Sequence, residues 1–466
     1  MSALLIAAEF ALLLSVAVLT LYALRHYVLA QSRLWGFHRS DAVEIVGYYM
    51  PSITVLVPMH NEEKVAADIL EALTQCDYDR AKLEILVIDD RSTDATAEIV
   101  DEVAAANPAI KALHRTKGNG GKAGALRFAT PQATGEILLL FDADYIPGRT
   151  MLKWLVAPFC DPEVGAVMGR VVPHNIGDSV LAGLLSLERA AGYQVGQQAR
   201  HQMGLAPQFG GTVGGVRKSA LHAVGGWNED SLTEDTDLTC RLLLAGWRTS
   251  YVNRAECYEE VPHGWPERRQ QLTRWVLGHA ECFHRYWRPV LFSPRLTSAE
   301  KIDTLFMLAC YFTAPVMVLA WVASLTMFCL VGLKGLTALA LTAAFTGYQL
   351  FANQSTFFEI GTAALLDGPD TRILLLPANI LNFFASFGAI CAALVRFYAR
   401  RVFGLGSGDW YKTPRSRQRL NGNGANGNGN GNGNGNGYTH IHREGVDLNT
   451  WLAQASRRSR AEEGAL

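Results

Sequence analysis

The chain has 466 residues, of which 49% are hydrophobic and 18% charged, and its formal net charge is −1. This length accommodates a catalytic domain with extra elements, the charge-poor composition favours a membrane protein, and the balanced charge excludes nucleic acid as an expected partner. The eight cysteines show no CxxC pair and no zinc-type spacing with histidine, so we expect them to be reduced packing residues.

The first predicted element is a transmembrane helix at residues 1–30. Residues 2–24 contain one charged side chain, Glu9, and are about long enough to cross a bilayer. A signal peptide is disfavoured because the run is long and lacks a cationic start. Positive charge follows the run, beginning at Arg25, which predicts a cytosolic position for the next block.

Residues 50–290 alternate strand-like and helix-like patterns. Compact apolar runs predict strands at residues 53–58, 83–90, 110–115, 135–144 and 163–171. Strands that alternate with helices indicate an α/β fold with a mostly parallel sheet covered on both faces. Ligands of such sheets bind beyond the carboxyl ends of the strands.

Acidic residues end two of these predicted strands. Asp89 and Asp90 close the second strand, and "FDAD" puts Asp142 and Asp144 at the end of the fourth. Two carboxylates this close repel unless a cation lies between them, and Mg²⁺ or Mn²⁺ shared with phosphate oxygens suits that position. Solvated loop acids are the alternative. Lys122, in the glycine-rich "GGKAGAL", would add a cation beside a diphosphate.

The segment "LTEDTDL" opens a predicted helix with three acids, Glu234, Asp235 and Asp237. Taken alone it is explained by capping, because acids are favoured at a helix N-terminus. The alternative is that Asp235 points into a site as a general base.

A later helix, "RRQQLTRWVLGH", places Gln271, Arg274 and Trp275 on one face. That face offers an amide, a fixed cation and a flat indole, which would bind an anion and stack a ring. An amphipathic helix that rests on a membrane surface is the alternative.

Residues 301–400 contain further apolar runs, at 305–333, 334–352, 357–366 and 373–394. We expect transmembrane or interfacial helices here. If every run spans, the basic segment after residue 394 lies outside, against the charge rule. An interfacial or re-entrant segment around 355–366, or a last helix that does not span, would resolve this conflict. Residues 421–466 begin with an Asn/Gly repeat that has no apolar surface to bury, so they are predicted to be a disordered tail.

Several motifs occur in a fixed order: "HNEE", "DDRSTD", "KAGAL", "DAD", "FGGTVGG", "TED" and "QQLTRW". With them, the chain resembles the inverting family-two glycosyltransferases of the processive, membrane-integrated kind, which include cellulose, chitin, hyaluronan and plant mannan and glucomannan synthases. The similarity covers about residues 51–288. It implies a GT-A-type, Rossmann-like glycosyltransferase domain over residues 50–290, with transmembrane helices before and after it.

The resemblance also implies roles for individual residues on the donor side. Those that would bind the donor nucleotide sugar are Glu62, Asp89, Asp90, Lys122 and Asp142. Asp142 and Asp144 would form the metal site for Mg²⁺ or Mn²⁺, with Asp144 the better ligand.

On the catalytic side, the resemblance implies that Thr233, Glu234 and Asp235 form the catalytic segment, with Asp235 as the general base. The residues that would bind the acceptor or the leaving diphosphate are Gln271, Arg274, Trp275, Thr212 and His174.

Residues 401–420 contain "GSGDWYKTPR", which is similar to the gating loop of these synthases. Trp410, Thr413 and Arg415 would then cover the bound nucleotide. A juxtamembrane basic segment that binds anionic lipid is the alternative.

The resemblance therefore predicts a multi-pass protein of the plasma or inner membrane with a cytosolic catalytic domain. It would transfer a sugar from a nucleotide sugar, with a UDP-sugar favoured and GDP-mannose open, to a growing β-linked polysaccharide. One alternative is transfer to a diacylglycerol-type or other lipid acceptor. A non-enzymatic alternative is an inactive membrane scaffold that binds nucleotide sugars.

Overall fold

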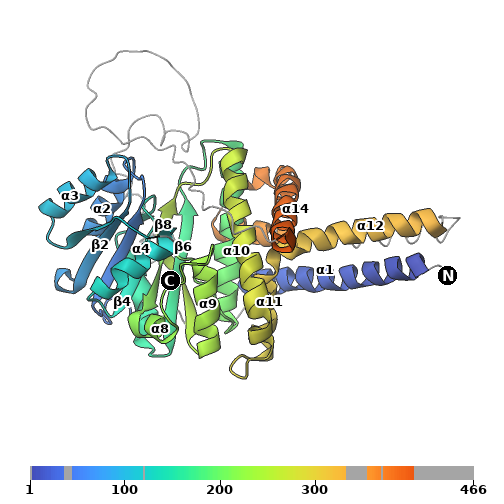
Figure 1. The fold of residues 1–466 in the computed structure, drawn as a ribbon, viewed down its shortest axis with the longest axis horizontal. Coiled ribbons are helices and arrows are strands. Elements are labelled where there is room, and N and C mark those ends of the chain that lie inside the picture. The colour runs from blue at the N-terminus through green and yellow to red at the C-terminus, as the bar shows by residue number, and fades with distance from the viewer. Residues whose placement is uncertain (1–2, 36–44, 119–120, 332–353, 369–370, 404–466) are drawn as a thin grey trace, which may run out of the picture.

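The computed structural model describes residues 3–35, 45–118, 121–331, 354–368 and 371–403. These residues form an α/β domain with long helices attached to one side (Figure 1). The predicted α/β fold class and its flanking apolar helices are confirmed.

The described residues form one eight-stranded sheet in the order β3-β2-β1-β4-β7-β6-β8-β5. The strands are β1 (Ile53–Met59), β2 (Leu83–Asp90), β3 (Ile110–Arg115), β4 (Ile137–Leu140), β5 (Ile146–Pro147), β6 (Val164–Pro173), β7 (Gly214–Arg217) and β8 (Arg248–Glu259). Four predicted strands, at 53–58, 83–90, 110–115 and 163–171, match β1, β2, β3 and β6 to within two residues at each end. The predicted strand at 135–144 is shorter, since β4 ends at Leu140, and β5, β7 and β8 were not predicted.

Strand β7 separates the parallel strands β3, β2, β1 and β4 from the parallel pair β6 and β8, and β5 is antiparallel to β8 at the outer edge. Strand β7 is antiparallel to both β4 and β6, whereas β1 is parallel to β2 and β4, and β6 is parallel to β8. A Cβ on Gly215 would lie 2.6 Å from Leu139 Cδ2, and one on Gly214 would lie 2.7 Å from the carbonyl oxygen of Val167. The close approach of β7 to its neighbours therefore needs glycine at both positions. Because two reversals cancel, β1, β2, β4, β6 and β8 all end at the same edge of the sheet.

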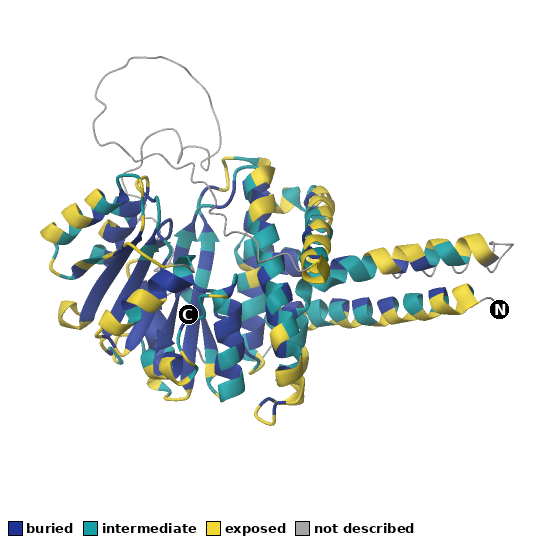
Figure 2. Cartoon of the chain, in the orientation of Figure 1, coloured by how far each residue is buried: buried dark blue, intermediate teal, exposed yellow. Residues whose placement is uncertain are grey.

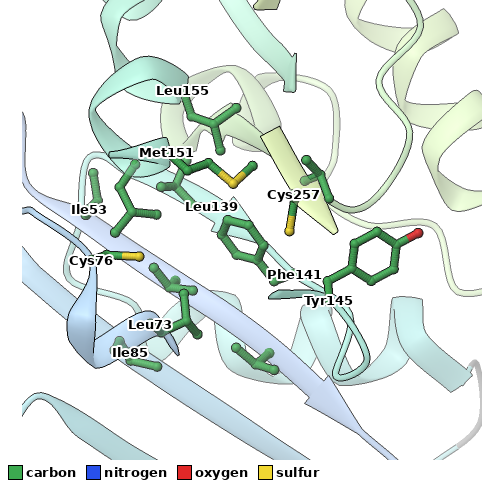
Figure 3. Packing of buried hydrophobic residues seen from close by; sticks show 14 of the residues in the cluster. Ile53, Leu73, Cys76, Ile85, Leu139, Phe141, Tyr145, Met151, Leu155 and Cys257 are labelled. Carbon is green, nitrogen blue, oxygen red and sulfur yellow. The ribbon is translucent and has the colours of Figure 1, made fainter. Parts of the chain in front are cut away.

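Two apolar clusters cover the two faces of the sheet. Alternate residues of β1 point to opposite faces, so Val55 and Val57 join one cluster and Leu56 the other. The first cluster packs under α2 (Ala66–Gln75), α3 (Thr96–Ala106) and α5 (Met151–Val156), and Figure 3 shows its centre around Leu139 and Phe141. The second packs under α4 (Gly121–Ala129), α8 (Lys218–Ala223) and α9 (Glu234–Ala245). Figure 2 shows the buried sheet between helices with exposed outer faces.

The remaining helices lie between the sheet and the membrane-type helices. They are α6 (Val180–Ala190), the π-helix η5 (Ala191–Gln197), α7 (Gln198–Gln202), α10 (Trp265–Leu291) and α11 (Ser298–Leu308), and residues 354–366 are also helical. Short 3-10 turns are η2 (Arg80–Lys82), η3 (Thr130–Gln132), η4 (Ala157–Cys160), η6 (Cys310–Phe312) and η7 (Thr371–Leu375).

Within the described ranges, three segments are long and apolar enough to cross a membrane: Ala3–Trp35, Cys310–Leu330 and Asn379–Phe403. Helices α1 (Ala3–Trp35) and α12 (Thr313–Val331) extend side by side away from the domain (Figure 1). Helix α14 (Asn379–Phe403) instead stays beside α10. The apolar run at 305–333 is not one helix, because η6 separates α11 from α12. The predicted run at 334–352 lies entirely outside the described residues.

All eight cysteines lie in the described residues and are free thiols, as the spacing predicted.

Candidate active site

Residues predicted to bind the donor nucleotide sugar lie where strands β1, β2 and β4 end, at the shared edge of the sheet. Met59 at the end of β1 pairs with Asp89 of β2, so the segment that follows β1 lies beside the acidic end of β2. Glu62 is buried in that segment, and its backbone N–H donates to Thr96 Oγ1 at 2.7 Å. Asp142 follows β4 at the same edge. The structure thus brings Glu62, Asp89, Asp90 and Asp142 to one edge.

Asp90 is ion-paired. Its Oδ1 accepts hydrogen bonds from Arg115 Nη1 at 2.9 Å and from Arg91 Nε at 2.9 Å, and the Arg115 side chain is buried. Arg91 also donates to the carbonyl oxygen of Gly118 at 2.6 Å, which ties the loop before Lys122 to Asp90. Sequence reasoning did not single out either arginine, and the pairing of Arg115 with Asp90 depends on the register between β2 and β3.

Lys122 joins three of the predicted motifs. Its Nζ donates to Asp142 Oδ1 and lies 3.9 Å from Glu234 Oε1. The backbone N–H of Asp142 donates to Thr212 Oγ1 at 3.0 Å. Burial alone would lower the pKa of Lys122, but the Asp142 and Glu234 carboxylates raise it above its ordinary value. Lys122 is therefore a firmly charged ammonium group between two acidic motifs.

The "FGGT" loop lies directly against the "TED" segment. Gly211 has φ +73°, and a Cβ there would lie 3.0 Å from Asp235 Cβ and 3.3 Å from Glu234 Oε1. Glycine is thus required both by the backbone conformation and by the close approach. This contact places Thr212, Glu234 and Asp235 around the same point.

The three acids at the start of α9 have different environments. Asp237 is fully buried, and it accepts hydrogen bonds from Asn228, Arg241, Arg285 and Tyr286. It is a structural carboxylate that joins α9 to α10. Burial raises the pKa of Glu234 to about 7, opposed by Lys122 and reinforced by Asp235. Asp235 Oδ1 accepts the backbone N–H of Thr236 at 2.7 Å.

Helix α10 passes close to the start of α9. A Cβ on Gly278 would lie 2.3 Å from Thr233 Cγ2, so the two elements are in contact at that position. One turn earlier on α10, the carbonyl oxygen of Trp275 lies 3.1 Å from Nδ1 of His279. Burial lowers the pKa of His279, whereas the nearby Asp235 carboxylate raises it. Sequence reasoning did not identify His279, which the structure places near Asp235.

Two guanidinium groups lie over the Trp275 ring. The Arg189 and Arg268 Cζ atoms are 5.1 Å and 5.3 Å from the ring centroid. Arg268 also donates to Gln271 Oε1 at 2.9 Å, so Gln271 faces this cluster. Arg274 forms no hydrogen bond or ion pair with any residue in the described ranges. The predicted face of α10 is therefore formed, and two arginines contact its indole.

The parallel pair β6 and β8 brings further residues to this edge. The backbone N–H of His174, which follows β6, donates to the carbonyl oxygen of Glu259 at the end of β8 at 3.0 Å. The Glu259 carboxylate in turn binds Arg189 and Tyr145. Glu259, Arg189 and Tyr145 were missed by sequence reasoning, since no motif marks a carboxylate whose partners are 70 and 114 residues away along the chain.

The acidic pair fits a divalent cation that phosphate oxygens help to hold. Asp144 is 4% exposed, and Asp142 is partly exposed. Burial and the Glu259 carboxylate raise the pKa of Tyr145 most, and Asp144 and Asp142 raise it further. Among the residues that the structure describes, no group of three or more His, Cys, Asp or Glu side chains could hold a metal ion without other ligands. A hard cation that retains phosphate ligands needs only one or two protein carboxylates.

The predicted gating residues Trp410, Thr413 and Arg415 lie outside the described residues.

Residues 51–278 match the family described as "Glycosyltransferase like family 2". A beta-monoglucosyldiacylglycerol synthase of Nostoc sp. is 32% identical over 296 residues, which cover 61% of this chain and 63% of that protein. A probable glucomannan 4-beta-mannosyltransferase of Arabidopsis thaliana is 29% identical over 281 residues, 58% of this chain and 50% of that protein. The chain thus spans less than two thirds of the length of these relatives.

One solved structure supports the same assignment. The mannosyltransferase PcManGT from Pyrobaculum calidifontis, solved with GDP-Man and Mn²⁺, aligns with a TM-score of 0.53 and 25% identity. The alignment covers 78% of this chain and 97% of that one. The sheet order and the residues gathered at its edge agree with this similarity of residues 51–278 to the glycosyltransferases of family two.

Proposed function

We propose that the protein is an inverting hexosyltransferase that takes a sugar from a nucleotide-sugar donor and transfers it to a membrane-associated acceptor. The observation that supports this most is the cluster of Lys122, Asp142, Glu234 and Asp235. These residues come from three separate segments of the chain and lie around one point of the sheet edge.

The proposed reaction is a single displacement. The acceptor hydroxyl gives its proton to the Asp235 carboxylate, and its oxygen forms a bond to the anomeric carbon of the donor sugar. The bond from that carbon to the diphosphate oxygen breaks, and its electron pair stays on the leaving nucleoside diphosphate. One displacement inverts the anomeric centre, so an α-linked donor gives a β-linked product.

Positive charge is needed where the leaving group becomes more negative. Lys122 and Arg274 would supply it from α4 and α10. Asp142 and Asp144 would hold Mg²⁺ or Mn²⁺, which would neutralise the diphosphate. Glu62, Asp89 and Asp90 would line the nucleoside side of the site, and Thr212 and His174 the acceptor side.

A growing β-linked polysaccharide is the acceptor that we propose first, because the motifs resemble mannan and glucomannan synthases and one such relative matches the chain. A diacylglycerol-type lipid is the second candidate. It is favoured by the packing of the site helix: Leu272, Val276 and Ala280 of α10 contact Ala393 and Leu394 of the membrane-type helix α14.

A donor screen tests the proposal. Purified protein in detergent would be incubated with UDP-glucose, UDP-N-acetylglucosamine or GDP-mannose and with Mg²⁺ or Mn²⁺, and release of nucleoside diphosphate measured. We propose a UDP-sugar as the donor, with GDP-mannose second, since the similar mannosyltransferase was solved with GDP-Man. Radiolabelled product that extracts into chloroform–methanol identifies a lipid acceptor, and product that does not extract identifies a polymer. Absence of turnover with every donor would contradict the proposed activity.

Substitution of the base gives the sharpest test of mechanism. Asp235→Asn should lower turnover at least ~100-fold, because the amide cannot accept the proton, while donor binding by equilibrium dialysis stays near wild type. Asp230→Asn is a matched control, since Asp230 is an exposed carboxylate just before the same helix. Turnover near wild type in Asp235→Asn would show that another group is the base.

A further inference from the structure

Glu259 is a buried carboxylate that contacts two separate parts of the candidate site. It ends β8, is 4% exposed, and uses both of its oxygens. Oε2 accepts a hydrogen bond from the Tyr145 hydroxyl at 2.7 Å, and Oε1 accepts one from Arg189 Nε at 2.5 Å. Arg189 Nη2 donates to Oε2 as well, at 3.3 Å. A buried charge held in this way is fixed in position.

The first contact leads to the proposed metal motif. Tyr145 directly follows Asp144, so an anchor on its side chain restrains the backbone that carries the carboxylate. Figure 3 shows the Tyr145 ring at the edge of the apolar cluster, with its hydroxyl directed away from that cluster. The hydroxyl therefore needs a polar partner, and Glu259 supplies it.

The second contact leads to the indole. Arg189, on α6, lies with its guanidinium over the Trp275 ring, and its side chain is only 20% exposed beside the buried Glu259 carboxylate. Without that carboxylate, Arg189 would be a largely buried cation with no counter-charge and would be drawn toward water. Its contact with the indole face would then be lost. Arg268 is held over the same ring by Glu188, at 2.5 Å, and does not depend on Glu259.

We propose that Glu259 is a positioning residue that holds the Trp275 indole, through Arg189, at a fixed place relative to the Asp142–Asp144 motif. The acceptor sugar or headgroup would stack on that indole, so Glu259 sets where the acceptor hydroxyl lies relative to the donor. Glu259 itself touches neither substrate. The inference rests on the proposed function and adds a residue to it that none of the sequence motifs contains.

The test compares Glu259→Gln with Glu256→Gln. Glu256 lies on the same strand and also pairs with a buried arginine, Arg170, at 2.9 Å, but Arg170 keeps a second partner in Asp367. Both substitutions remove one carboxylate charge from β8. Sugar transfer would be assayed with dioleoylglycerol and, in parallel, with a β-1,4-linked tetrasaccharide as the acceptor. Donor hydrolysis would be measured as the release of nucleoside diphosphate in the absence of an acceptor.

Glu259→Gln should raise the acceptor KM about tenfold, the size expected for loss of one desolvated cation–π contact, and leave donor hydrolysis within about twofold. Glu256→Gln should change neither quantity. Glu259→Asp, which keeps the charge, should recover part of the acceptor affinity. Glu259→Gln should also add little to Trp275→Phe, because both changes disrupt the same contact.

Equal loss of hydrolysis and transfer with an unchanged acceptor KM would overturn the inference, as would additive effects of Glu259→Gln and Trp275→Phe. If Glu259→Gln fails to fold, Glu259→Gln/Arg189→Gln removes both charges and leaves no unpaired ion, and the same rise in acceptor KM is expected. Failure of the proposed function would be seen in the wild-type protein instead of in the variants. That protein would release no nucleoside diphosphate from any donor, or would transfer sugar to neither acceptor. Either result would also overturn the inference about Glu259.

Discussion

At the scale of single residues, Glu234 is a carboxyl group of the site whose ionisation is strongly perturbed. It lies next to Asp235 and 3.9 Å from Lys122, and burial raises its pKa from an ordinary 4.5 to about 7. Between pH 4.5 and 7, Glu234 therefore keeps its proton in the folded protein and loses it in the unfolded chain.

This shift predicts the pH dependence of stability of the metal-free protein. Because folding raises the pKa of Glu234, the folded state binds more protons between pH 4.5 and 7. The contribution of Glu234 to the free energy of unfolding then falls across that range, by up to about 3 kcal/mol, and stays low above it. Glu234→Gln should become more stable relative to wild type as pH rises from 4.5 to 7. Urea unfolding at several pH values measures this, and a difference that does not change with pH would contradict it.

The residues of the site divide into those that sequence could and could not reveal. Lys122, Asp142, Thr212 and Asp235 lie in short motifs next to predicted strand ends or helix starts, and the structure places them together. Their roles stay predictions. Arg115, Arg189 and Glu259 carry no local signal. Their importance comes from ion pairs that form only when strand register and helix packing are fixed.

At the scale of elements, the contact between α9 and α10 positions the proposed base. Gly278 of α10 lies against Thr233, which precedes Glu234 and Asp235. Helix α10 can approach this closely only because residue 278 has no side chain.

Gly278→Ala tests this contact. The added methyl group would lie 2.3 Å from Thr233 Cγ2 and 2.6 Å from its Oγ1, so the helices must separate. We expect a loss of about 1–3 kcal/mol in the free energy of unfolding and a lower turnover. Gly388→Ala is the control: it also lies within a helix, α14, and its Cβ would meet nothing within 4 Å. The control should leave stability unchanged or raise it by up to about 1 kcal/mol. Equal effects of the two substitutions would contradict the close packing.

The elements found by sequence are those with strong patterns. Strand β1 is a continuous run of apolar and β-branched residues, and β2 contains the apolar run at residues 85–88. Strands β2 and β3 have the predicted bounds. Strand β7 reads "GGVR", and its two glycines are unfavourable for a strand in isolation. Strand β8 contains several charged residues that the fold pairs within the domain, such as Glu256 and Glu259. Pairing within the sheet, rather than local propensity, forms these strands.

At the scale of the whole molecule, one carboxylate joins the first candidate span to the domain. Asp303 of α11 binds Arg25 of α1 at 2.8 Å and Arg200 of α7 at 3.0 Å, and all three side chains are largely buried. This group could not be predicted from local patterns, because Arg25 and Arg200 are 175 residues apart along the chain and Arg200 and Asp303 are 103 apart.

Asp303→Leu should strongly destabilise the assembly of these helices. Two buried arginines would lose their shared counter-charge, at a cost of about 3–5 kcal/mol. Thermal unfolding in detergent micelles should show a lower Tm. Glu300→Gln removes a charge from the same helix while Gln can keep the capping box with Thr297, so its Tm should stay near wild type. An unchanged Tm in Asp303→Leu would show that the cluster does not hold α1 in place.

The arrangement of the apolar helices was only partly predictable. Apolar length located α1, α12 and α14, but it could not show that η6 interrupts the run at 305–333 or that α14 stays beside α10 (Figure 1). The interfacial segment predicted around 355–366 corresponds to helical residues 354–366. Which of these helices lies across the bilayer depends on contacts with lipid, and hydrophobicity along the chain does not determine that.

The glycine strand β7 also bears on how such a protein can diversify. The segments that carry Glu62, Asp90 and Asp142 and those that carry His174 and Glu259 lie on opposite sides of these four residues in the sheet. Loops on the two sides leave from different strands, so one can lengthen or change sequence while the strands that carry the other stay the same. A lineage could thus exchange one acceptor for another while its nucleotide pocket remained as inherited.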